Sequence, residues 1–238
     1  MTENSAPALG IIMLDTSFPR PPGDVGHAAS WRCPVRLRRV TGATADVVIR
    51  QGAAGLLPAF IDAGNALVAE GCCALVTSCG FMAPHQQAIA KALPVPFAAS
   101  SLMQVPSVAA GLPAGRVPGI LTYDAASLSP QFLRLAGLDP SLPVIGMPKG
   151  GAFQGMIEGG QPYDADAMQA EMLAAAERLI SQNPAVGAII SECTNMPPFS
   201  HAISRATGLA VFDILTLGHW LHHASSPRHF THEPEINV

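Results

Sequence analysis

Charged residues are scarce in this chain of 238 residues, where Asp, Glu, Lys and Arg make up 13% and aromatic residues only 5%. The net charge of −4 provides no basic surface for a phosphate backbone, which excludes nucleic acid as an expected partner. The N-terminus lacks a basic segment followed by an apolar core, and no apolar run is long enough to cross a bilayer. We therefore expect a cytoplasmic protein with no membrane partner.

The cysteines do not form the pattern of a disulfide framework. There are five of them, an odd number, and no CxxC pair occurs. The glycine-rich signature of a phosphate-binding loop is also missing, which disfavours nucleotides and pyridoxal phosphate. Free thiols and no cofactor are therefore expected. The hydrophobic content of 49% is enough to bury parallel strands.

One segment of the sequence occurs twice. Residues 74–84 (ALVTSCGFMAP) match residues 188–198 (AIISECTNMPP), which aligns Cys79 with Cys193. Earlier in each half, residues 10–15 (GIIMLD) match residues 119–124 (GILTYD). Each segment is an apolar, β-prone run that ends in polar residues. Two copies of one supersecondary unit are therefore predicted.

Strands and helices are expected to alternate along both halves. This alternation predicts parallel sheets with helices on both faces. The expected fold class is α/β, with two pseudo-symmetric doubly wound domains and an active site in the cleft between them. We expect residues 1–103 together with 209–238 to form the first domain, and residues 104–208 the second. The proline- and glycine-rich segment 18–27 is predicted to be a long ordered loop.

Both repeated cysteines are predicted to lie at the carboxyl ends of strands, where open α/β sheets bind ligands. If the two sheets face one cleft, Cys79 and Cys193 approach a ligand from opposite sides. A thiolate whose pKa is lowered by a helix N-terminus could remove a proton beside a carboxylate, while the opposite thiol protonates the other face. Backbone amides, Ser78, Thr194 and Asn195 are the candidate donors to the carbanion.

At these residues the sequence resembles the aspartate/glutamate racemase superfamily, cofactor-independent two-cysteine enzymes that include hydantoin racemases, maleate isomerases and arylmalonate decarboxylases. Residues 193–197 (CTNMP) are similar to the Cys-Thr-His-x-Pro motif of glutamate racemases, and residues 15–17 (DTS) resemble their Asp-Ser pair. The resemblance implies that Cys79 and Cys193 are the acid/base pair and that Asp15 assists Cys79. It also implies that Thr194 and nearby amides hold the substrate carboxylate, and that the protein is a homodimer.

The sequence departs from this superfamily at three positions. Gly80 and Phe81 follow the first cysteine in place of Asn-Thr, which removes two donors and adds an apolar wall. Asn195 replaces the histidine of the second motif. The expected catalytic residues are Cys79 and Cys193. The expected substrate-binding residues are Asp15, Thr16, Ser78, Gly80, Phe81, Thr122, Tyr123, Thr194 and Asn195.

The function predicted from these observations is that of an isomerase, a racemase or epimerase of a small carbon acid such as an amino acid, a hydantoin or a related carboxylate. Because both cysteines are present, the decarboxylase subgroup, which keeps only the second, is disfavoured. A lyase such as a cysteine-dependent decarboxylase, a cis-trans isomerase of a small dicarboxylate, or a non-catalytic binding protein stays an alternative. Contacts of Asp24, His27 and Lys149 with substrate are left open. No metal site is expected at His219, His222, His223, His229 and His232, since no carboxylate or cysteine completes a ligand set.

Overall fold

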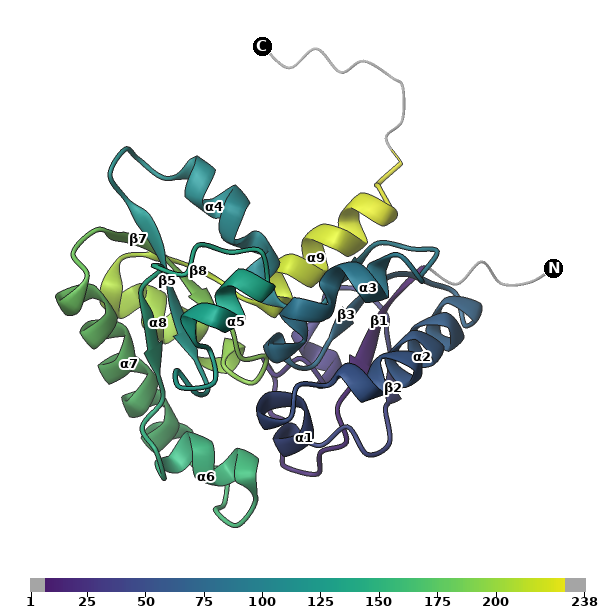
Figure 1. Cartoon of the computed structure of the whole chain (residues 1–238), viewed down its shortest axis with the longest axis horizontal. Helices are drawn as coiled ribbons and strands as arrows, with labels where there is room; N and C mark the ends of the chain where they lie inside the picture. The colour runs from purple at the N-terminus through teal and green to yellow at the C-terminus, as the bar shows by residue number, and fades with distance from the viewer. Residues whose placement is uncertain (1–6, 230–238) are drawn as a thin grey trace.

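The computed structural model describes residues 7–229, and this part of the chain contains two four-stranded parallel sheets (Figure 1). The strand order is β2-β1-β3-β4 in the first sheet and β6-β5-β7-β8 in the second. The equivalent orders confirm the expected fold class. The strands are β1 (Ala8–Met13), β2 (Val35–Arg39), β3 (Cys72–Thr77), β4 (Phe97–Ala98), β5 (Val117–Thr122), β6 (Val144–Gly146), β7 (Val186–Ser191) and β8 (Ala210–Phe212).

Helices connect the strands in the expected order, and two short ones, α1 and α6, were not predicted. They have six and seven residues and lie in connections that already contain a longer helix, α2 or α7, so the alternation of strands and helices does not require them. The α-helices are α1 (Ala45–Arg50), α2 (Leu57–Ala69), α3 (Gln86–Ala90), α4 (Val105–Gly111), α5 (Pro130–Leu135), α6 (Ala152–Glu158), α7 (Ala165–Gln182), α8 (Ser200–Thr207) and α9 (Ile214–Ser225). The 3-10 helices are η1 (Ala28–Ser30), η2 (Ala54–Leu56), η3 (Gly80–His85), η4 (Ser101–Gln104) and η5 (Pro197–Phe199).

The two halves lie side by side, and helix α9 returns to the first half (Figure 1). We expected residues 209–238 to belong to the first domain. Strand β8 instead pairs with β7 of the second sheet, and only α9 packs against β3 and β1. Strand pairing therefore places residues up to Phe212 in the second half, and the chain crosses back to the first half after this residue. The remaining domain boundaries stay a proposal.

The core lies between the sheets and their helices. The strands β1 and β3 are almost entirely buried, and α2 packs Phe60 and Leu67 against this sheet. Burial of each such side chain stabilises the fold by roughly 1.5–3 kcal/mol. Among residues 7–229 we find no helix that has both the length and the apolar character to cross a membrane.

Candidate active site

The two repeated cysteines follow equivalent strands in the two sheets. Strand β3 ends at Thr77, two residues before Cys79, and β7 ends at Ser191, two residues before Cys193. In each sheet the neighbouring strand, β1 or β5, runs parallel and brings its own carboxyl end to the same edge. The structure thereby brings both cysteines to one cavity between the halves.

This cysteine cavity has a volume of about 30 Å³, close to the space of one water molecule. Six of its residues also line a larger outer pocket of about 650 Å³, namely Thr16, Phe18, Ala45, Ile49, Tyr123 and Ile157. The cysteine cavity and the outer pocket therefore adjoin along these side chains. The remaining residues of the cysteine cavity are Leu14, Arg20, Ser78, Cys79, Gly80, Phe81, Glu192, Cys193, Thr194 and Asn195.

Each thiol accepts a hydrogen bond from the backbone N–H two residues further on, Phe81 for Cys79 and Asn195 for Cys193. These bonds lower the pKa of each thiol, but burial and the nearby Glu192 carboxylate raise it more. The expected lowering of the cysteine pKa by a helix N-terminus is therefore wrong. The elements that follow the cysteines are short 3-10 turns, whose dipoles are small.

Glu192 is a site residue that sequence reasoning missed. It directly precedes Cys193, and its side chain is only 1% exposed. The Thr122 hydroxyl donates to Glu192 Oε2 at 2.7 Å, and Oε1 has no hydrogen-bond partner within the described residues. Burial raises the pKa of Glu192 to about 7, against hydrogen bonds from Thr122 and the Tyr123 N–H that lower it. A charged residue at the end of the apolar run 188–191 was the available sequence signal.

The raised pKa of Glu192 predicts a pH-dependent stability. Between pH 4.5 and 7 this carboxyl group is ionised in the unfolded chain but protonated in the folded one, so the free energy of unfolding falls as pH rises. Over this pH range we expect the free energy of unfolding of wild type to fall by about 2–3 kcal/mol relative to that of Glu192→Gln. Above pH 7 the difference between the two proteins should change little. Urea denaturation at pH 5 and pH 7.5 measures the difference. Parallel stability curves for the two proteins would contradict it.

The predicted loop, residues 18–27, reaches across to the second cysteine. Asp24, 1% exposed, accepts hydrogen bonds from Arg20 at 2.7 Å and from the Asn195 amide at 2.5 Å. Arg20 also donates to Thr16 Oγ1 at 2.7 Å, and the Val25 N–H donates to the Thr194 carbonyl at 3.2 Å. The loop therefore closes one wall of the cavity and brings a guanidinium group to it. Sequence reasoning did not identify Arg20.

We expect Asp24→Asn to lower the free energy of unfolding by about 2–4 kcal/mol, because it leaves Arg20 without its partner in a largely buried ion pair. Urea denaturation checks this value. The matched control is Asp46→Asn, whose ion pair with Arg50 is exposed and should contribute less than about 0.5 kcal/mol. Equal changes in the free energy of unfolding for the two substitutions would show that the ion pair of Asp24 with Arg20 does not stabilise the loop of residues 18–27.

Several predicted binding groups make contacts within the protein. The Thr194 hydroxyl donates to the Ser78 carbonyl at 2.7 Å, and Ser78 Oγ accepts the Leu14 N–H at 2.8 Å. The Thr194–Ser78 bond joins the halves at the cavity, whereas the Leu14–Ser78 bond lies within the first half. Asp15 lines only the outer pocket, where it accepts the Gly42 N–H at 2.9 Å. The structure therefore does not place Asp15 with Cys79 in the cysteine cavity.

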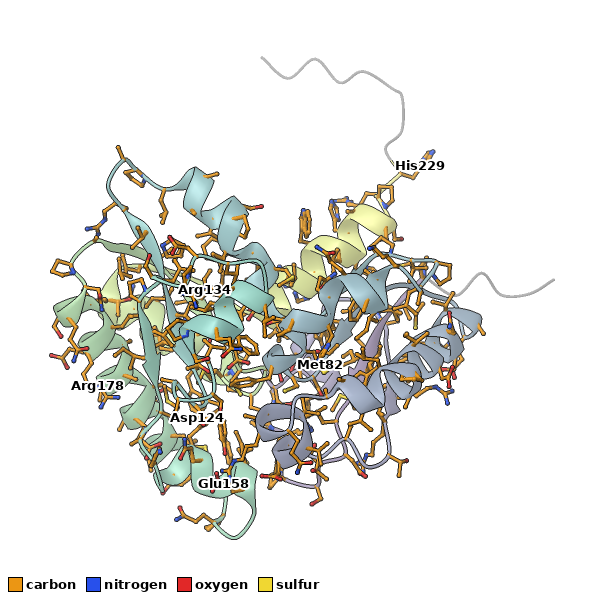
Figure 2. All side chains as sticks on the ribbon, in the orientation of Figure 1. Met82, Asp124, Arg134, Glu158, Arg178 and His229 are labelled. Atoms are coloured by element: carbon orange, nitrogen blue, oxygen red, sulfur yellow. The ribbon has the colours of Figure 1, made fainter. Side chains whose placement is uncertain are left out.

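Three polar side chains that line the outer pocket contact one another in a row. The Tyr123 hydroxyl donates to Glu158 at 2.7 Å, and Arg50 lies 3.3 Å from the same carboxylate oxygen. Figure 2 shows Glu158 on α6, on the side of the molecule where α6 approaches α1 of the other half. Burial and the Glu158 carboxylate raise the pKa of Tyr123. The contacts of Glu158 with Tyr123 and Arg50 therefore join the two halves over the outer pocket.

Other residues left open by the sequence lie outside the cysteine cavity. Lys149 lines a polar pocket with Asp124 and Glu158 that adjoins the outer pocket, and His27 Nδ1 accepts the Ala29 N–H at the start of η1. No group of three or more His, Cys, Asp or Glu side chains within residues 7–229 is arranged to hold a metal. His232 lies outside the described residues.

Similar sequences include several proteins named dimethylsulfoniopropionate lyase. The chain is 30% identical over 225 residues to dimethylsulfoniopropionate lyase 3 of Emiliania huxleyi, covering 88% of this chain and 57% of that protein. It is 30% identical over 217 residues to a dimethylsulfoniopropionate lyase of Durusdinium sp. clade D, covering 87% and 71%. The chain thus spans little more than half the length of the first relative. No protein-family profile matches it.

Similar solved structures include racemases and a decarboxylase. Allantoin racemase from Klebsiella pneumoniae superposes with a TM-score of 0.63 at 14% identity, covering 92% of this chain and 86% of the other. Unliganded arylmalonate decarboxylase gives a TM-score of 0.61 at 14% identity, covering 96% of both chains. At these identities the likeness concerns the fold alone.

The predicted isomerase, a racemase of amino-acid metabolism, is therefore wrong, since the relatives at 30% identity are named lyases. The error has a chemical reason. Removal of a proton beside a carboxylate begins both racemisation and elimination, and the cysteine motifs report only that step. What differs is the group on the next carbon, which belongs to the substrate.

Proposed function

Because the chain belongs to the dimethylsulfoniopropionate lyase family and has the fold of the aspartate/glutamate racemase superfamily, we propose that it is a lyase that cleaves dimethylsulfoniopropionate. This substrate is a zwitterion with a sulfonium group two carbons from a carboxylate. The observation that carries the proposal is the placement of Cys79 and Cys193 at one cavity between two sheet edges.

The reaction is an elimination. A thiolate takes a proton from the carbon beside the carboxylate, and the electrons of that C–H bond form the carbon–carbon double bond. The carbon–sulfur bond breaks, and its electrons remain on sulfur. The products are neutral dimethyl sulfide, acrylate and one proton, which passes from the thiol to solvent. Because the leaving group departs as a neutral molecule, it needs no general acid.

Elimination requires only one base, and we assign it to Cys193. Its side chain is half-buried, whereas Cys79 is buried, and its thiol lies 3.6 Å from Asn195 Oδ1. The Asn195 N–H stabilises the thiolate. In the empty site burial and the Glu192 carboxylate oppose ionisation, and a bound sulfonium offsets both effects because it adds a positive charge.

The substrate carboxylate is assigned to the Arg20 end of the cavity and to the amides that follow the cysteines. Arg20 presents a guanidinium group with five N–H donors, of which Asp24 and Thr16 take two. A cation there stabilises the second negative charge that develops on the carboxylate as the proton leaves. The predicted homodimer, cytoplasmic location and absence of a cofactor stay predictions.

Headspace gas chromatography tests the proposal. The purified chain is incubated with dimethylsulfoniopropionate, and dimethyl sulfide is measured over time against the same protein after alkylation of its thiols. We expect the untreated protein to release dimethyl sulfide and the protein with alkylated thiols to release none. Absence of release from the untreated protein, or release that alkylation leaves unchanged, would contradict the proposed lyase.

A further inference from the structure

Glu192 is a buried carboxyl group for which the described residues supply no cation. None of the ion pairs within residues 7–229 includes it, and its Oε1 has no hydrogen-bond partner there. An ionised carboxylate in such a place is costly unless a positive charge joins it. Glu192 also lines the cavity that holds Cys79 and Cys193. A ligand entering that cavity can therefore supply the missing charge.

The walls around Glu192 suit a cation that has no hydrogen-bond donors. The rings of Phe81 and Tyr123 line the same cavity, although aromatic residues make up only 5% of the chain. The Phe18 ring also lines it, but the Arg20 guanidinium carbon already lies 4.5 Å from the centroid of that ring. Aromatic faces attract alkylated cations by their quadrupoles. Arg20 brings the opposite charge to this cavity. The lining is thus complementary to a zwitterion rather than to a simple carboxylate.

We propose that Glu192 recognises the positive charge of the substrate and selects cationic substrates over neutral ones of the same shape. This specificity role rests on the proposed function, because it names the group that holds the sulfonium of the same substrate. The role differs from that of the base. Glu192 binds the leaving group, and Cys193 takes the proton.

The chemistry predicts how this role divides between binding and turnover. As the carbon–sulfur bond breaks, the sulfur loses its positive charge, so the attraction to Glu192 is larger for bound substrate than for the transition state. An interaction stronger in the ground state lowers KM without raising kcat. Glu192→Gln should therefore raise KM at least tenfold while kcat stays unchanged or rises.

The Asp124 carboxylate repels the ionised form of Glu192, and ionised Glu192 in turn raises the pKa of the Cys79 and Cys193 thiols. Arg20 and Tyr123 line the same cavity. Binding of a cation reverses this balance and should release the proton of Glu192 near neutral pH. The affinity of a ligand with a positive group should consequently rise from pH 6 to pH 8. The affinity of a ligand of the same shape that lacks the positive group should fall over this range.

Calorimetry with two unreactive ligands tests the inference directly. They are 3-(trimethylammonio)propionate and 4,4-dimethylpentanoate, which have the same shape and carboxylate but differ by one positive charge. We expect wild type to bind the cationic ligand at least tenfold more tightly, and Glu192→Gln to reduce this ratio to within twofold. Glu177→Gln is the control, since this exposed carboxylate on α7 lines neither the outer pocket nor the cysteine cavity. It should keep the wild-type ratio.

A ratio that is unchanged in Glu192→Gln, or a wild type with no preference for the cation, would overturn the inference. If Glu192→Gln does not fold, the opposite pH dependences of the two ligands in wild type decide the matter, and parallel dependences would overturn it. Ligand binding needs no turnover. A protein that shows the preference but releases no dimethyl sulfide would refute the lyase and retain the cation site, whereas the reverse result would refute the cation site alone.

Discussion

Cys193→Ala is expected to lower kcat/KM for dimethylsulfoniopropionate by about 10³-fold, because loss of a general base removes a factor of 10²–10⁴. Cys193→Ser should be nearly as inactive, since a hydroxyl group ionises far less readily than a thiol. In Cys79→Ala we expect kcat/KM to fall by only about tenfold, because elimination needs one base and not two. Initial rates of dimethyl sulfide release measure all three effects.

The matched control is Cys33→Ala. Cys33 is a half-buried free cysteine that lines neither the cysteine cavity nor the outer pocket. It should keep activity within twofold of wild type. Equal losses in Cys79→Ala and Cys193→Ala would indicate a two-base mechanism. Activity of Cys193→Ala within tenfold of wild type would show that the base lies elsewhere.

Gly80→Ala is expected to reduce kcat/KM at least about 100-fold and to lower the free energy of unfolding by about 1–3 kcal/mol. A methyl group at Gly80 would lie 2.1 Å from Glu192 Oε1 and 2.5 Å from the Glu192 backbone carbonyl oxygen. The side-chain atom could rotate away, but the carbonyl belongs to the segment that holds Cys193. The substitution must therefore shift the two cysteine segments apart.

Gly111→Ala provides the comparison for this substitution. Gly111 ends α4, and a methyl group there would meet no atom within 4 Å. This change should leave activity unaltered and stabilise the helix by about 0.5–1 kcal/mol. Kinetics and urea denaturation of both variants separate the steric effect from the general effect of losing a glycine. Full activity in Gly80→Ala would mean that the Glu192 segment is not packed against Gly80 as described.

The internal repeat explains why much of the fold could be predicted. An apolar strand followed by a cysteine has the same local causes in both halves, so the alignment of Cys79 with Cys193 also aligns β3 with β7. The end of the chain was harder. Strand β8 has only three residues, and its pairing with β7 depends on packing that no local pattern records.

The site was predictable only where its residues belong to the repeat. Glu192 aligns with Ser78, so the repeat gave no reason to select it, and its burial depends on the packing of the two halves. Arg20 and Asp24 lie in a loop whose composition indicates only irregular structure. The contact between Asp24 and Asn195 joins residues 171 positions apart. Such contacts arise from tertiary structure and leave no trace in the local sequence.

The most direct test of the account follows the fate of the proton beside the carboxylate. The purified chain is incubated with dimethylsulfoniopropionate that carries two deuterium atoms on that carbon, and the products are identified by NMR. Our account predicts dimethyl sulfide and acrylate in equal amounts, acrylate that keeps one deuterium, and a slower rate than with unlabelled substrate. A saturated product that keeps both deuterium atoms, such as 3-hydroxypropionate, would contradict removal of the proton beside the carboxylate.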